Sequence, residues 1–395
     1  MVSVRGAAEV SAEAFALGTF SAAEGAPSST GAVLFPGIVL GERVIPMRAF
    51  MPQLCAQGIE RGACESVQGM LDDWTHVFPA LERAVHEVQS SGLLPDIQAG
   101  RARHTQAGAS SAPANCAIPL ERLRVHAPIP RPGTIYCSGA NYKKHVAELI
   151  VAHQSDERTR GMSLEEKRAW AMALMDRRAE SGTPFIFVKP GSALTGPFDS
   201  ITIPDVRQKP DWELELAVVI GRRARRVSRE TALEHVAGYT IANDLTLRAK
   251  VFRAKTESPE LGMDFVVSKG APGFLPLGPY LVPAAFVPDP QKLRLTPKLN
   301  GQVMQDEETA DMIFSVARLI EYLSAGVELQ PGDIICTGSP AGNGMHYGRF
   351  IQDGDEMEGA ITGLGVQRNR CVRDGELRWH APGNNGAALG TPHRP

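Results

Sequence analysis

The sequence predicts a mixed α/β fold in which strands dominate, and three stretches of the chain carry this prediction. In residues 211–220, polar and apolar side chains alternate and then give way to a β-branched run, which is typical of a strand entering a core. Residues 239–242, Tyr-Thr-Ile-Ala, form a second such run. In the final third, short apolar runs alternate with turns, and Asn300-Gly301 is a strong hairpin signal.

Length and composition indicate a soluble globular protein of up to two domains. At 395 residues the chain can bury a large core, and 43% hydrophobic and 22% charged residues are ordinary for such a protein. The 41 basic and 44 acidic residues leave a net charge of −3, so we expect no nucleic-acid partner. No apolar run is long enough to cross a bilayer, and the opening residues lack a signal-peptide core. We therefore expect no membrane partner and a cytoplasmic location.

The chain divides into a small first domain, a large second domain and a tail. Residues 1–120 combine predicted strands at 32–35 and 38–45, a helix at 66–92 and an Ala/Ser/Gly-rich linker at 98–115. Residues 121–373 hold the motifs that carry chemistry and an amphipathic helix at 311–324. Residues 374–395 are polar and glycine-rich, and we expect them to be disordered.

Three carboxylates point to a metal site. Because side chains alternate along a strand, Glu213 and Glu215 share a face, with Leu214 and Leu216 opposite. Two adjacent like charges near a core need a cation, and Mg²⁺, Mn²⁺ and Ca²⁺ prefer oxygen ligands. The second strand ends at Asp244, which can bring a third carboxylate beside the first strand. The alternative is a half-exposed strand with a polar face.

We predict a short helix between these two strands. Ser228 can cap it, it runs to about His235, and Gly238 can end it before the second strand begins.

A second candidate group precedes the carboxylates. His145 and Glu148 are three residues apart, so on a helix they share a face and can form a dyad in which the carboxylate orients the imidazole. The alternative is an ordinary surface pair.

The residues that follow this pair form a charged helical insertion at 149–181. Ser163 opens a capping box, and the helix continues to about residue 180 with one side formed by Trp170, Ala173, Leu174 and Arg177. We predict that the insertion is a lid over the dyad; the alternative is a solvated helix.

Other polar residues follow strands or turns. Lys189 and Lys269, with Arg248 four residues after Asp244, can bind a substrate anion or simply lie at the surface. Residues 331–344 form a strand that opens into a glycine-rich loop without the Gly-Lys-Ser/Thr of a nucleotide P-loop. Backbone amides beside Thr337 can hold a carboxylate or an enolate.

Taken together, these residues resemble the fumarylacetoacetate hydrolase family. The matching motifs are N-Y-x-x-H-x-x-E at 141–148, F-x-K-P at 187–190, D-W-E-x-E-L at 211–216, G-Y-T-x-x-N-D at 238–244, K-G at 269–270, P-L-G-P at 276–279, L-N-G at 299–301 and L-x-P-G-D-I-I-x-T-G-x-P-A-G at 329–342. Their order and spacing agree with the family over residues 120–370.

The resemblance implies a fold and a set of roles. It implies a rolled mixed β-sheet domain preceded by a small N-terminal domain, a homodimer, and a small keto or diketo acid as substrate. A divalent metal, with Mg²⁺ expected first and Mn²⁺ or Ca²⁺ as alternatives, would be held by Glu213, Glu215 and Asp244. The implied roles of other residues are water activation by His145 and Glu148, enolate stabilisation by Lys269, and substrate binding by Lys189, Arg248, Thr337 and Tyr142.

Three departures from the family pattern concern the substrate. Pro272 stands where the family usually has an aspartate, Val251 stands where it often has a glutamine, and the insertion after Glu148 is long. We predict metal-dependent hydrolysis of a C–C bond in a β-diketone or 2,4-diketo acid within a catabolic route. The alternatives are a decarboxylase, isomerase or hydratase of an enolisable keto acid, and a non-catalytic metal- or ligand-binding protein.

Overall fold

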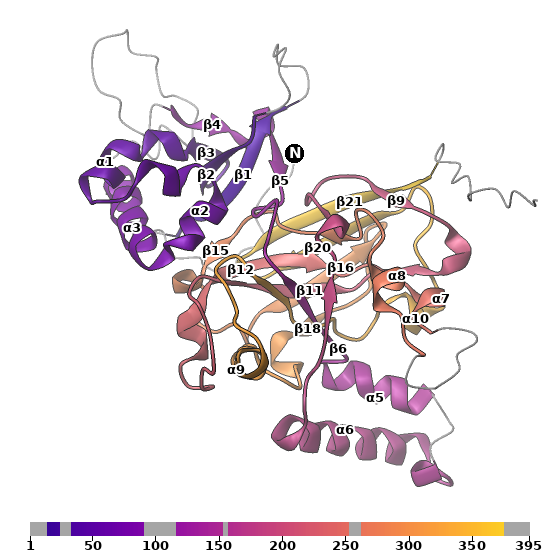
Figure 1. Ribbon diagram of the computed structural model, residues 1–395. Helices are drawn as coiled ribbons and strands as arrows, with labels where there is room; N and C mark the ends of the chain where they lie inside the picture. Colours follow the sequence, from indigo (N-terminus) through magenta and orange to yellow (C-terminus); the bar gives the residue numbers. More distant parts are fainter. Residues whose placement is uncertain (1–13, 24–32, 91–115, 153–156, 253–261, 375–395) are drawn as a thin grey trace, which may run out of the picture.

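The computed structural model describes residues 14–23, 33–90, 116–152, 157–252 and 262–374 (Figure 1). Within these ranges strands dominate, which confirms the predicted mixed and mostly β fold. The predicted linker at 98–115 lies outside the described residues, as does the predicted tail beyond residue 374. None of the described helices is long and apolar enough to cross a bilayer.

An antiparallel sheet and three helices form the N-terminal part, at the upper left of Figure 1. The strand order is β4 (Ile118–Pro119), β3 (Arg43–Pro46), β2 (Phe35–Leu40), β1 (Ala16–Ala22) and β5 (Leu123–His126). β5 pairs with β1, so residues 123–126 belong to the same sheet as the first strands of the chain. The predicted helix at 66–92 is divided at Asp73 into α2 (Val67–Asp72) and α3 (Trp74–Ser90), and α1 (Met51–Ala56) precedes them.

A mixed six-stranded sheet forms the centre of the molecule. Its order is β15 (Val282–Pro283), β12 (Val236–Asn243), β11 (Leu214–Ile220), β19 (Ile334–Cys336), β6 (Ile135–Gly139) and β7 (Phe185–Lys189), and only β19 and β6 run parallel. The two faces of β11 enter different cores, as alternation requires. Ala217 and Val219 pack in the core that contains the N-terminal helices, whereas Leu216 and Val218 pack with α9 (Val316–Gly326).

A second large sheet packs against the central one. It contains β17 (Gln302–Val303), β16 (Arg294–Leu299), β20 (Glu356–Ile361), β21 (Gly365–Arg373) and β9 (Ile201–Ile203), with β18 (Glu307–Glu308) also paired to β16. Leu295 and Ile361 share a buried cluster with Leu214 of the central sheet. The turn between β16 and β17 holds Asn300 at φ 50° and Gly301 at φ 81°, which confirms the predicted hairpin.

Shorter elements complete the described chain. Two small sheets pair β10 (Pro210–Asp211) with β13 (Thr246–Leu247) and β14 (Leu275–Pro276) with β8 (Leu194–Thr195). The short helices are α7 (Arg248–Val251), α8 (Phe265–Lys269) and α10 (Gly344–Tyr347). Single 3₁₀ turns are η1 (Met47–Ala49), η2 (Arg61–Cys64), η4 (Leu120–Arg122), η5 (Glu157–Thr159), η6 (Gly191–Ala193), η7 (Val206–Gln208), η10 (Ala284–Phe286) and η11 (Thr309–Asp311).

The connection between β11 and β12 differs from the prediction. A 3₁₀ turn, η8 (Ala232–His235), replaces the expected helix. Gly238 lies inside β12, opposite Pro283, and does not end a helix. A Cβ at this position would lie 2.2 Å from the backbone oxygen of Val282, so glycine permits the close approach of β15.

The amphipathic helix expected at 311–324 also has different bounds. Ser315 caps the helix through the backbone N–H of Arg318, and α9 therefore starts at Val316. Asp311 belongs to the preceding 3₁₀ turn.

The insertion begins within α5 (Lys143–Ala152) and contains α6 (Leu164–Ser181), and these two helices pack together at the bottom of Figure 1. The capping box between Ser163 and Glu166 is present, as predicted. The predicted apolar side of α6 is wrong in detail, since Ala173 and Arg177 are exposed. Ala171 and Met175 are the buried residues, and Met175 joins the core beneath α9. This helix therefore rests on the body of the protein.

Candidate active site and metal centre

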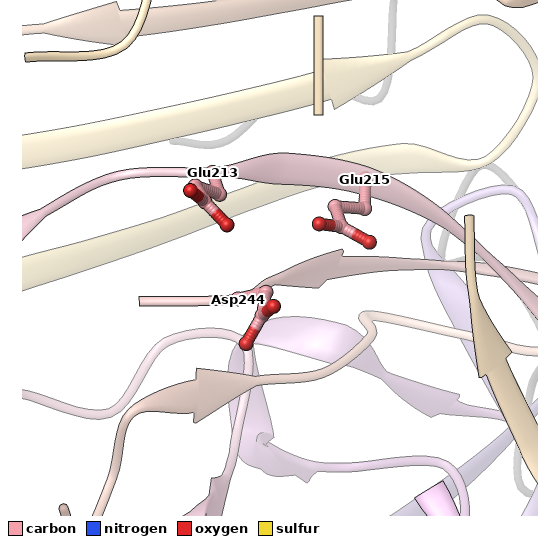
Figure 2. Close-up of side chains that lie close together, drawn as sticks. All are labelled: Glu213, Glu215 and Asp244. Carbon is pink, nitrogen blue, oxygen red and sulfur yellow. The ribbon is translucent and has the colours of Figure 1, made fainter. Parts of the chain in front are cut away.

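Strand pairing brings the three predicted carboxylates together. Leu214 lies opposite Asn243 in the antiparallel register, so Asp244 follows beside Glu213, and the Asp244 N–H donates to the Glu213 carbonyl at 2.8 Å. Glu213, just before β11, and Glu215 on β11 point to the same side, and Asp244 follows the end of the neighbouring strand β12 (Figure 2). One carboxylate oxygen from each residue lies within 4.8 Å of the other two. The predicted grouping of these three residues is therefore present.

Two lysines bind this cluster directly. The Lys269 ammonium donates to Glu213 Oε2 at 2.7 Å and to Asp244 Oδ2 at 2.6 Å, and also to the Thr246 hydroxyl. The Lys189 ammonium donates to Asp244 Oδ1 at 2.6 Å and to the Leu245 carbonyl at 3.1 Å. Both side chains are buried, so each removes much of the electrostatic cost of placing carboxylates in the interior.

Arg248 forms the third cationic contact. Its guanidinium lies 2.5 Å from Glu213 Oε1 and donates to Asp211 Oδ2 at 2.7 Å. Asp211 is buried and also accepts the N–H of Gly344 at 2.5 Å. Arg248 is therefore fixed between two acids at the start of β11.

Glu213 and Glu215 differ in pKa because their surroundings differ. Burial, followed by the neighbouring Asp244, raises the pKa of Glu215 well above its usual value. Burial also acts to raise the pKa of Glu213, but Arg248 and Lys269 outweigh it and lower that pKa to about 2. Glu215 is 2% exposed and forms no ion pair within the part of the chain that the structure describes. A buried carboxyl group without a cationic partner, in an all-oxygen donor set, fits a hard divalent cation that would replace its proton.

His145 lies beside the carboxylates on α5. Its side chain lines the cavity in front of them, and burial lowers its pKa to about 4, with Glu213 opposing this effect and Arg248 adding to it. The imidazole is therefore neutral at pH 7 and has a free lone pair to accept a proton.

The predicted dyad does not form in this structure. Glu148 Oε2 lies 3.1 Å from Nδ1 of His346 on α10, and both side chains are partly exposed. His145 and Glu148 share a helix face, as their spacing predicts, but the Glu148 carboxylate contacts His346 instead of His145.

Three residues predicted to bind substrate lie elsewhere. Thr337 is fully buried and donates its hydroxyl to the Leu216 carbonyl at 2.9 Å. Tyr142 is fully buried in the core that contains α9. Lys189 lies behind Asp244, outside the cavity lining, whereas Arg248 is part of that lining, as predicted.

The glycine-rich loop also has a different role from the one expected. The Gly338 N–H donates to Glu215 Oε2 at 2.7 Å. At φ 96°, Gly338 adopts a conformation that favours glycine. The amide of Gly338 therefore positions the carboxyl group of Glu215.

A cavity of about 640 Å³ opens in front of the three carboxylates. Its lining includes residues that the sequence analysis missed, notably Ser138, Ser339, Asn343, Phe185, Phe187 and Phe265. Ser339 and Asn343 lie in the glycine-rich loop, whose composition was the available signal. The phenylalanines follow no spacing that distinguishes them from core residues.

Comparison with known proteins identifies the chain. The family description "Fumarylacetoacetate (FAA) hydrolase C-terminal" matches residues 134–372. The chain belongs to the fumarylacetoacetate hydrolase family. This match confirms the resemblance, and it starts at the central sheet, after the N-terminal strands.

Curated relatives of the chain include several oxaloacetate tautomerases. Oxaloacetate tautomerase FAHD2A, mitochondrial, from Bos taurus is 35% identical over 257 residues, which are 65% of this chain and 71% of that protein. Oxaloacetate tautomerase YisK from Bacillus subtilis (strain 168) is 34% identical over 255 residues, covering 64% of this chain and 74% of that protein.

Solved structures of the family share the fold over most of the chain. A putative HpcE protein from Mycobacterium smegmatis is 28% identical with a TM-score of 0.60, covering 90% of this chain and 99% of that chain. Maleylpyruvate hydrolase from Sphingobium sp. SYK-6, in complex with manganese(II) and pyruvate, is 24% identical with a TM-score of 0.59, covering 91% and 99%. At that identity the second likeness concerns the fold alone.

Proposed function

We propose that this protein is a metal-dependent tautomerase that interconverts the keto and enol forms of a 2-oxo acid. The observation that carries the proposal is that a neutral imidazole, three grouped carboxylates and Lys269 meet at one cavity. Family relatives that are 34–35% identical are oxaloacetate tautomerases, which supports this reaction class. The proposal replaces C–C hydrolysis, the activity we expected first, with isomerisation, one of the alternatives.

The chemistry requires a base and a stabiliser of negative charge. His145 takes the proton from the carbon next to the carbonyl, and a proton is returned to the carbonyl oxygen to complete the enol. Lys269 supplies positive charge beside the developing enolate oxygen. A divalent cation held by Glu213, Glu215 and Asp244 would supply Lewis-acid stabilisation of that oxygen. This exchange consumes no water and needs no second base.

Hydrolysis of a C–C bond in a 2,4-diketo acid is the second candidate. It needs a water molecule activated by a base, which is the role predicted for the dyad. His145 and Glu148 lie one turn apart on α5, so rotation of the Glu148 side chain away from His346 could form that pair. The third alternative is a binding protein without catalytic activity. It does not explain why a neutral imidazole lies beside the carboxylates.

A direct assay separates these functions. Enolic oxaloacetate is diluted into buffer with Mg²⁺, and the decay of its enol absorbance is followed while acetylpyruvate is tested in parallel for acetate and pyruvate. We expect faster decay of the enol with protein and no cleavage of acetylpyruvate. The His145→Gln variant should lose this acceleration, and His76→Gln, which changes an exposed histidine on α3, should retain it.

Either of two results would overturn the assignment. Cleavage of acetylpyruvate without any acceleration of enol decay would establish the hydrolase instead. Absence of both activities in a protein that binds Mg²⁺ and pyruvate would support the binding protein.

Three finer expectations belong to the same proposal. We propose Mg²⁺ as the ion, because the donor set is all oxygen, with Mn²⁺ and Ca²⁺ as alternatives. We propose a homodimer, because the family resemblance implies one. We propose the cytoplasm as the compartment, as expected above.

A further inference from the structure

The cavity has an apolar half that the carboxylate chemistry does not use. Phe187 on β7 and Phe265 on α8 stack with ring centroids 4.6 Å apart and planes at 13°. Phe185 packs beside them, 5.5 Å from the Phe265 ring. All three line the cavity, so the cluster presents aromatic surface to whatever occupies it.

Phe187 connects this aromatic cluster to the catalytic end. The Lys269 ammonium, which binds Glu213 and Asp244, lies 5.2 Å from the centroid of the Phe187 ring. A ligand whose carbonyl oxygen reaches Lys269 therefore directs its next atoms along Phe187 and Phe265. The aromatic cluster therefore begins one side chain away from the Lys269 ammonium.

The mouth of the cavity continues the apolar surface. Phe252, Met263 and Met345 line it and are 66%, 51% and 45% exposed, and Phe350 lies further in. Covering such exposed apolar side chains with a ligand removes apolar surface from water and therefore favours binding.

The size of the cavity agrees with a long ligand. At about 640 Å³ it falls within the roughly 300–1,000 Å³ typical of sites for drug-sized molecules. A four-carbon acid would contact the carboxylate end and leave the aromatic cluster uncovered.

We infer that the substrate is a 2-oxo acid with an aromatic or large apolar group beyond its enolisable carbon, and that this group packs on Phe187 and Phe265. The inference rests on the proposed function for the reacting end, and it adds the substrate class. Asn343 fits the polar end of such a molecule, since it is 2% exposed, lines the cavity, and its side-chain amide nitrogen has no partner among the described residues.

The alternative is a substrate whose group beyond the enolisable carbon, its tail, is a second carboxylate. Lys209 lines the same cavity, with its ammonium 5.6 Å from the centroid of the Phe350 ring, and it could pair with such a group. The aromatic cluster offers no hydrogen-bond donor to a carboxylate, which favours the apolar tail.

Binding measurements on the Mg²⁺-loaded full chain test this inference. Calorimetry compares pyruvate, phenylpyruvate and 2-oxoglutarate, which share the 2-oxo acid and differ in the tail. We expect phenylpyruvate to bind on the order of tenfold or more tightly than pyruvate, the factor that burial of one aromatic group provides. We expect 2-oxoglutarate to bind no more tightly than pyruvate.

Single substitutions test where the apolar group of the ligand binds. Phe187→Ala and Phe265→Ala should each bring the ratio of the dissociation constants of pyruvate and phenylpyruvate towards one. Phe265→Leu, which keeps an apolar side chain in α8, serves if an alanine variant does not fold. Val266→Ala on the same helix is the matched control, because Val266 is 66% exposed and is not part of the cavity lining.

The outcomes separate this inference from the proposed function. Three results would overturn the apolar tail even if the protein is a tautomerase. They are equal affinity of the wild type for pyruvate and phenylpyruvate, tighter binding of 2-oxoglutarate than of pyruvate, and an unchanged preference for phenylpyruvate in both phenylalanine variants. A high ratio that collapses in the variants would support the tail even if enol decay is not accelerated. A change of oligomeric state in the variants, with the ratio unchanged, would assign the aromatic cluster to contacts between copies of the chain.

Discussion

The carboxylate of Glu148 lies 3.1 Å from the imidazole of His346 and turns away from His145. This contact joins α5 to α10, two short helices that lie near each other in Figure 1. It leaves His145 as a single neutral base beside Glu213. The pair predicted to activate water is therefore not assembled in this structure.

Replacement of His145 and Glu148 should have unequal effects. We expect His145→Gln to lower kcat for tautomerisation by about 10²–10⁴, the usual contribution of a general base. Glu148→Gln should keep kcat within about threefold, because its carboxylate acts on His346 and not on the base. Steady-state kinetics with an enolic 2-oxo acid measures both.

His346→Gln is the control for the contact itself and should resemble Glu148→Gln. Losses of similar size in His145→Gln and Glu148→Gln would mean that the two residues act as a pair in the working enzyme, and hydrolysis would again become the leading function.

Metal binding should release a proton from Glu215. Burial and Asp244 raise the pKa of this carboxyl, so it holds a proton at pH values where an ordinary glutamate has lost it. The cation needs the ionised form, and its affinity should therefore rise with pH and fall as the pH is lowered. Calorimetry with Mg²⁺ and Mn²⁺ in buffers of different ionisation enthalpy measures the number of protons released.

Glu215→Gln should weaken binding and abolish the proton release, while Glu213→Gln and Asp244→Asn should weaken binding and retain part of it. Unchanged affinity in all three variants would remove the metal from this site.

The grouping of these carboxylates was predictable from sequence, because strand alternation is local. The E-x-E spacing places Glu213 and Glu215 on one face, and a strand ending in Asp244 supplies the third group. The partner of Glu148 was not predictable. His346 is almost two hundred residues away, and only the tertiary fold brings α10 to α5.

Other differences have the same origin in long-range packing. Gly238 has the local signature of a helix end, yet it is a strand residue because the backbone of β15 comes too close for a side chain. Thr337 was expected at the substrate, but β19 turns its hydroxyl towards the Leu216 carbonyl. The aromatic cluster of Phe185, Phe187 and Phe265 joins two elements that are distant in sequence, so no single motif contained it.

Lys189 should stabilise the fold more than an exposed lysine does. Its ion pair with Asp244 is almost fully buried, and removing one partner of such a pair costs about 3–5 kcal/mol. Lys143→Met is the matched control, because the pair of Lys143 with Asp176 is partly exposed and should contribute about 0–1 kcal/mol. Urea unfolding of Lys189→Met and Lys143→Met at pH 7 without metal gives the two free energies. Equal losses would show that the buried contact carries no special stability.

Ligand binding should slow hydrogen exchange in α6. Arg178 lines the cavity and donates to the Ala140 carbonyl at 3.0 Å, so a ligand that contacts this edge also fixes the helix. Mass spectrometry with and without Mg²⁺ and phenylpyruvate should show slower exchange across 164–181 and no change in α3. Arg178→Ala should remove the difference. Equal exchange with and without ligand would make α6 a rigid part of the fold and would oppose the predicted lid.

We propose that Glu213, Glu215 and Asp244 hold a divalent cation that allows His145 to move a proton at the carbon beside a carbonyl. Proton NMR in D₂O tests it directly, by following the exchange of the C3 protons of phenylpyruvate for deuterium. We predict exchange that requires Mg²⁺ or Mn²⁺, that chelation abolishes, and that is lost in His145→Gln and Glu215→Gln but not in His76→Gln. Exchange at the same rate after chelation, or full exchange in His145→Gln, would show that the cation, or His145, is not needed for this proton transfer.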